Sequence, residues 1–91
     1  METGATMTTA ILTKQQKSKQ KTQNRIVLMA LALISEPVDY TDGLGQFQKM
    51  TGMDGVTAGL TIDRLVRRGL ATRDRRIAAL TRMGLLVASG Y

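Results

Sequence analysis

Apolar residues with helical spacing first appear in the middle of the chain. The run 26–34 is apolar throughout, and within it Val27, Leu28, Leu31 and Ile34 follow the i, i+1, i+4, i+7 spacing of one helix face. This spacing, together with the high helix propensity of Leu and Ala, predicts a helix that begins near Asn24. Pro37 cannot continue a helix and restricts the residue before it, so we expect the helix to end near Ser35.

Two further helices follow at short separation. We expect the second to begin after Asp42, which would cap it, and to end at Gly52. Its apolar face would carry Leu44, Phe47 and Met50. The third helix is predicted over 55–68, capped by Asp54 and stopped by Gly69. Two helices joined by a tight, glycine-containing turn form the helix-turn-helix pattern.

A short hairpin and a last helix complete the predicted order of elements. Residues 70–73 and 76–80 are predicted to form two strands around a charged pivot at Asp74-Arg75. Thr81 would then cap a short helix that reaches residue 86 or 87. The whole pattern predicts a mainly α-helical fold with a minimal two-stranded hairpin.

The third helix has two distinct faces at 100° per residue. Its expected core stripe consists of Ala58, Ile62, Leu65 and Val66. The opposite face carries Val56, Thr57, Leu60, Arg64 and Arg67, with Thr61 and Arg68 beside them. Arginine reaches phosphates and guanine edges, threonine bonds to bases or phosphates, and aliphatic side chains meet thymine methyl groups, as in a recognition helix. The alternative is that Val56 and Leu60 pack under the N-terminal segment or against a partner subunit.

The charge of the chain is strongly segregated. Thirteen Lys and Arg against seven Asp and Glu give a net charge of +6, which favours polyanionic partners. Residues 1–23 hold four lysines against one glutamate, and we predict a basic, flexible arm that is disordered or weakly helical. It would either contact phosphates or only add solubility. Residues 64–91 hold seven arginines against Asp74 alone, within the predicted domain 24–91.

Several classes of function are disfavoured by what the sequence lacks. Without Cys or His, it has no thiolate, no imidazole base and no His metal site, zinc fingers are excluded, and its carboxylates show no paired spacing. We therefore expect neither an enzyme nor a cofactor. The longest apolar run, 26–34, is far shorter than a membrane span, so we expect no membrane association and a cytoplasmic location.

The stretch from the second helix to the last one contains a series of short motifs: Gly52-Met53-Asp54, Ala58, Ile62-Asp63-Arg64-Leu65, Arg68-Gly69-Leu70, Asp74-Arg75-Arg76, Leu80-Thr81 and Gly84. In this series the chain resembles the MarR-type winged helix-turn-helix regulators. The family has Gly-Leu-Ser, Val, Val-Asp-Arg-Leu and Arg-Gly-Leu at the spacing of the first four. The block 25–33 is similar to the preceding family helix, so the resemblance covers about 25–86. It implies a winged helix-turn-helix fold and a DNA-binding transcriptional regulator, more often a repressor.

Two departures from the family pattern affect what the resemblance implies. The hairpin is about four or five residues shorter than a usual wing of the family, which puts its reach into the minor groove in doubt. The family's long C-terminal dimerisation helices do not follow the last predicted helix. A homodimer on a pseudo-palindromic site would therefore use the N-terminal segment, the first helix or the last helix.

The arginines receive different predicted roles in duplex binding. Arg64 would contact a base edge, whereas Arg67 and Arg68, further toward the end of the helix, would contact phosphates. Among the hairpin arginines Arg73, Arg75 and Arg76, Asp74 would hold one while another reaches the minor groove or its flanking phosphates. A simpler alternative pairs Asp63 or Asp74 with arginines on the surface, with no role in DNA binding. Another alternative is a protein-binding module that uses Val56 and Leu60.

Overall fold

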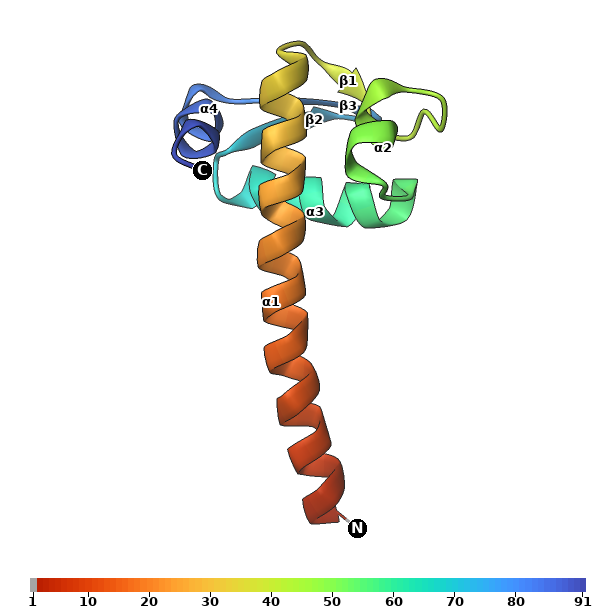
Figure 1. Ribbon diagram of the computed structural model, residues 1–91, viewed down its shortest axis with the longest axis vertical. Helices are drawn as coiled ribbons and strands as arrows, with labels where there is room; N and C mark the ends of the chain where they lie inside the picture. The colour runs from red at the N-terminus through yellow and green to blue at the C-terminus, as the bar shows by residue number, and fades with distance from the viewer. Residues whose placement is uncertain (1) are drawn as a thin grey trace.

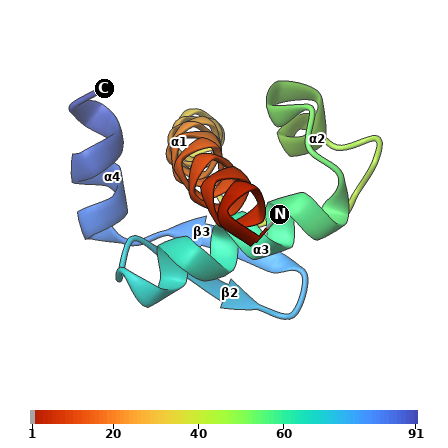
Figure 2. The same cartoon turned by 90° about the horizontal axis from the view of Figure 1, so that it is seen from below.

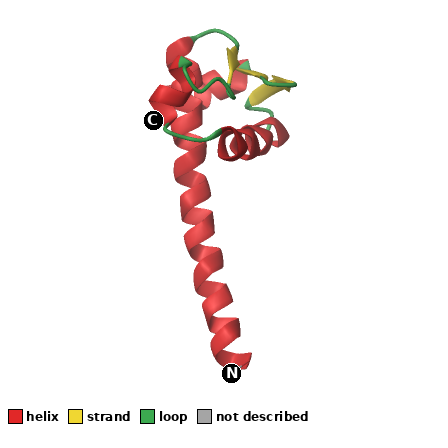
Figure 3. Ribbon diagram, turned by 90° about the vertical axis from the view of Figure 1, so that its right-hand side faces the viewer, coloured by secondary structure: helices red, strands yellow, loops and turns green. Residues whose placement is uncertain are grey.

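A computed structural model describes the backbone of residues 2–91 and the side chains from Ser18 onward. The chain is mainly helical, with one small three-stranded antiparallel sheet (Figures 1 and 3). Its elements are α1 (Glu2–Ile34), β1 (Val38–Asp39), α2 (Gln46–Thr51), α3 (Gly55–Arg67), β2 (Ala71–Asp74), β3 (Ile77–Leu80) and α4 (Arg82–Ser89). The predicted fold class, mainly α-helical with a hairpin, is confirmed.

Helix α1 is much longer than predicted. It begins at Glu2 rather than near Asn24, and its first half extends away from the other elements (Figure 1). The segment before Asn24 is rich in Lys, Gln and Thr and contains no proline, so nothing in it stops a helix. The division into an arm 1–23 and a domain 24–91 stays a prediction. At its other end α1 stops at Ile34, as Pro37 predicts, and Ser35 takes a left-handed φ of 62°.

The sheet has one strand more than predicted. Its order is β1-β3-β2, and β1 pairs with β3 through Val38 opposite Ala78. In the hairpin, Asp74 faces Ile77, so the turn consists of Arg75 and Arg76 and lies one residue beyond the predicted pivot. Both the two-stranded sheet and the Asp74-Arg75 pivot are therefore wrong. A two-residue strand is too short to show an alternating pattern, and its partner lies about forty positions away.

Helix α2 differs from the prediction at its start and on its face. Asp42 does not cap the helix, because its carboxylate instead accepts the N–H of Leu44 in a turn and α2 begins after Gly45. Leu44 is 85% exposed and lies outside α2, whereas Phe47 is buried as expected. Gly52 ends the helix with a φ of 65°, a conformation that glycine adopts without strain.

The core lies where α1 crosses α3. Its largest fully buried side chains are Phe47, Leu28, Ile62, Leu65, Val27 and Thr61. Three of the four residues expected on the core stripe of α3 are fully buried, but Val66 is 38% exposed because it lies at the edge of the buried arc. Helix α4 packs on α1 from the other side and is capped by Thr81 as predicted, with the hydroxyl accepting the N–H of Gly84 at 3.1 Å (Figure 2).

Candidate functional site

Helix α3 presents one face to solvent between two flanking elements. The β2–β3 hairpin lies along one flank and α1 crosses the other (Figure 2). The side chains between these flanks are Val56, Leu60 and Arg67, which we call the outer face of α3. Val56 is 74% exposed and Leu60 is 59% exposed, so two large aliphatic side chains lie in water beside a cation.

The rotation of α3 about its axis is fixed by its first turn and its buried side. The Asp54 carboxylate caps the helix, as predicted, and accepts the Thr57 N–H at 2.7 Å. That hydrogen bond lowers the pKa of Asp54 below its ordinary value. Gly59 lies so close to the Tyr40 ring that an added Cβ would be 3.3 Å from Tyr40 Cε1. The side of α3 that carries Gly59 therefore packs against the buried Tyr40 ring.

Thr61 does not belong to the exposed surface, contrary to prediction. Its side chain is 0% exposed, and its hydroxyl donates to the Thr57 carbonyl at 2.9 Å. Sequence reasoning placed it at the edge of the outer face, but α1 covers this flank of the helix. A direct contact between Thr61 and a ligand is excluded in this conformation.

Arg64 is turned toward α1 rather than outward, so its predicted place on the outward face in the middle of the helix is wrong. Its Nη2 donates to Gln23 Oε1 at 3.0 Å and to Thr61 Oγ1 at 3.2 Å, and its Nε donates to Asn24 Oδ1 at 3.3 Å. All three acceptors are neutral. Burial, and then the charge of Arg68, lowers the pKa of the Arg64 guanidinium, which still stays protonated.

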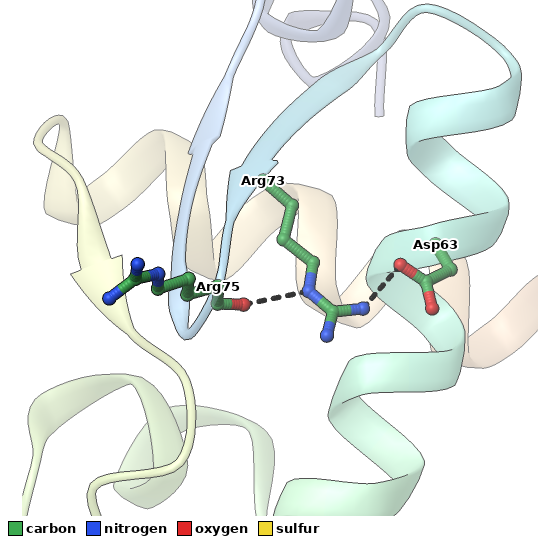
Figure 4. Close-up of polar contacts among 3 residues, drawn as sticks. All are labelled: Asp63, Arg73 and Arg75. Carbon is green, nitrogen blue, oxygen red and sulfur yellow. Dashed lines mark hydrogen bonds and ion pairs between the residues drawn. The ribbon is translucent and has the colours of Figure 1, made fainter.

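Of the three hairpin arginines, Arg73 is fixed by polar contacts, and Arg75 and Arg76 lie at the tip. Arg73 pairs with Asp63 of α3 and donates from Nε to the Arg75 carbonyl at 2.8 Å (Figure 4). The bond to Asp63 raises the pKa of Arg73, whose guanidinium carbon also lies 5.4 Å from the centre of the Tyr40 ring. The carboxylate that holds a hairpin arginine is therefore Asp63, not Asp74 as predicted.

The two tip arginines differ in their surroundings. The Arg75 side chain points away from Asp63, and its φ of 56° belongs to the tight turn (Figure 4). Arg76 lies near Asp39, whose pKa is lowered first by hydrogen bonds from Thr41 and also by the charge of Arg76. Both arginines are exposed.

The structure separates the predicted site residues into four groups. Exposed side chains are Val56, Leu60, Arg67, Arg68, Arg75 and Arg76. Thr57 and Arg64 are half-buried, Thr61 is buried, and Arg73 is exposed but paired with Asp63. Sequence reasoning missed Gln23 and Asn24, which orient Arg64 from forty positions away. No local signal in the sequence marks this contact.

No protein-family model, no curated protein and no solved structure matches the chain. Within the described residues, no helix is both long enough and apolar enough to cross a bilayer. Among the side chains that the structure describes, no three His, Cys, Asp or Glu residues gather as metal ligands would.

Proposed function

We propose that this chain is a sequence-specific duplex DNA-binding transcriptional regulator, more specifically a repressor, with a winged helix-turn-helix fold. In this interpretation α2, the turn at Gly52 and α3 form the helix-turn-helix, and the β2–β3 hairpin is a short wing. The resemblance to MarR-type regulators supports the proposal. So do the order of α2, α3 and the hairpin and the exposed cations on two of these elements.

The outer face of α3 is the observation that carries the proposal. Val56 and Leu60 leave apolar surface in water, which is unfavourable unless a partner covers it. In a major groove these side chains would meet thymine methyl groups, while Arg67 would reach a phosphate or a base edge. Arg75 and Arg76, on the neighbouring flank, would contact the sugar–phosphate backbone.

The decisive experiment measures affinity for duplex DNA against salt concentration. Fluorescence anisotropy with a duplex selected from a random pool would give a linear decrease of log K with log salt, by about 0.9 per phosphate contact. The variant Arg67→Gln and the double variant Arg75→Gln/Arg76→Gln should weaken binding. Arg82→Gln, at an exposed arginine beside Glu36 in a different surface pocket, is the matched control and should bind like the parent.

A protein-binding role is the second candidate, and the same two aliphatic side chains favour it. If the partner is a protein, Leu60→Ala should abolish binding of that protein while Arg67→Gln should not. Salt concentration should then have little effect on the affinity. If the partner is duplex DNA, the arginine variants and salt should have the larger effect. Because Leu60 is largely exposed, its replacement should leave the folding stability nearly unchanged.

A homodimer is part of the proposal, because winged modules that recognise pseudo-palindromic sites bind two half-sites about one helical turn apart. Exposed aliphatic side chains on α1 and α4, such as Leu33 and Leu86, supply apolar surface for such a contact. Sedimentation at micromolar concentration should give twice the mass of the chain, and a monomer at all concentrations would contradict the dimer. The proposal includes neither catalysis nor a cofactor, and it places the regulator in the cytoplasm.

A further inference from the structure

The flank of α3 that faces α1 collects positive charge without a described counterion. Lys21 and Asn24 of α1 line a groove together with Gln20 and, from the end of α3, Arg68. Arg64 is bonded to the same Asn24 and lies near enough to Arg68 for that charge to lower its pKa. No carboxylate lines the groove among the residues whose side chains are described.

Arg64 is held in a fixed orientation by groups that leave its charge uncompensated. Gln23, Asn24 and Thr61 accept hydrogen bonds from Nε and Nη2 only. Among the described residues, no acceptor takes the hydrogens of Nη1. A guanidinium that is positioned by neutral acceptors loses little side-chain freedom when it binds an anion, because its orientation is already set.

The flank of α3 that faces the hairpin differs from the α1 flank, because its arginine has a carboxylate partner. There, Arg73 is bonded to Asp63 and its charge is balanced within the molecule. On the α1 flank, burial and then the charge of Arg68 lower the pKa of Arg64, and Lys21 lines the same groove as Arg68. A bound anion would be attracted by all three cations. Helix α1 lies against α3 (Figure 2), and the outer face of α3 is where the proposed function places a duplex.

We propose that Lys21, Arg64 and Arg68 form a phosphate-binding site between α1 and α3 that takes a backbone phosphate of duplex DNA. This inference rests on the proposed function and deepens it, because it makes α1 part of the DNA-binding surface. It also changes the role of Arg64 from base contact to phosphate contact. Gln23 and Asn24 are positioning residues that act through Arg64.

Three variants test the site by different routes. Lys21→Gln and Arg68→Gln each remove one exposed charge. Each should reduce the slope of log K against log salt by about 0.9 and weaken duplex binding about five- to tenfold in 0.1 M salt. Gln23→Glu keeps every cation but places a carboxylate beside Arg64. It should weaken duplex binding to a similar extent while leaving the melting temperature equal to that of the parent or higher.

Arg82→Gln is the control, since it changes the net charge by the same amount as each test variant. If the parent and the control bind duplex with a steep salt dependence and all three variants match the parent, this site is refuted and the proposed function stands. If the parent itself binds no duplex, both are refuted. Should Gln23→Glu unfold, the two variants at exposed positions decide the question in the same assay.

Discussion

Gly84→Ala should destabilise the fold strongly, because no room exists for a methyl group at this position. A Cβ on Gly84 would overlap the carbonyl oxygen of Leu70 and would lie 2.9 Å from its carbonyl carbon and 3.0 Å from Leu80 Cδ2. That carbonyl cannot yield easily, since it accepts the Thr81 N–H at 3.1 Å. The Thr81 hydroxyl also donates to the Gly69 carbonyl at 2.6 Å, which fixes the same segment. The added methyl group therefore has to displace α4.

The magnitude follows from that displacement. A retreat of α4 by on the order of 1 Å would forfeit about a quarter to a half of the dispersion energy along its contact with α1. Overpacking of this kind costs about 1–3 kcal/mol, and a clash with backbone belongs at the upper end. Alanine recovers about 0.5–1 kcal/mol through its helix propensity. The net loss is about 2 kcal/mol, equivalent to a melting temperature lower by roughly 8–16 °C for a domain of this size.

Thermal unfolding followed by circular dichroism measures this difference directly. The matched control is Gly90→Ala at the end of the same helix, where the nearest atom to a new Cβ is the Val87 carbonyl oxygen at 3.5 Å. That contact is an ordinary one, so the control should melt within a few degrees of the parent. If Gly84→Ala melts as the parent does, the packing of α4 against Leu70 is not as described.

Further predictions concern pH, a helix cap and an ion pair. Hydrogen bonds from the threonine two or three residues downstream lower the pKa of Asp39 and Asp54 below the ordinary 3.8. The unfolded chain therefore binds more protons at these sites than the folded chain does, so the urea midpoint of unfolding should fall as pH decreases below about 4. The double variant Asp39→Asn/Asp54→Asn should show a smaller fall. Thr81→Ala should lower the free energy of unfolding by about 1 kcal/mol in urea titrations, and no loss would contradict the cap. Asp63→Asn removes the carboxylate that pairs with Arg73, so the slope of log K for duplex binding against log salt should become steeper by about one. A flatter slope would contradict this interpretation.

The features that sequence reasoning predicted correctly depend on neighbours in the chain. Pro37 ends α1 whatever surrounds it, and Gly52 and Gly69 take positive φ values of 65° and 74° where the helices stop. Asp54 and Thr81 cap their helices through hydrogen bonds to N–H groups three residues on. Each of these is a local event that a short stretch of sequence determines.

The errors come from contacts between distant parts of the chain. Helical spacing alone places Arg64 on the exposed side of α3 with Thr61 beside it, because it cannot reveal that α1 crosses that side of α3. The bond from Arg64 to Asn24 spans forty residues. Val38 pairs with Ala78 over the same separation, which is why β1 was missed. The candidate site was therefore predicted at the level of the helix that carries it, and its boundary toward α1 required the structure.

The central claim is that the outer face of α3 and the tip of the hairpin meet duplex DNA. Titration of the isotope-labelled protein with a selected duplex, followed by amide chemical shifts, tests it most directly. We expect the largest shift changes at the amides of Val56, Leu60, Arg67 and the turn Arg75-Arg76, and only small changes at the amides of α4. Saturating changes confined to α4, or no change at any amide in low salt, would contradict it.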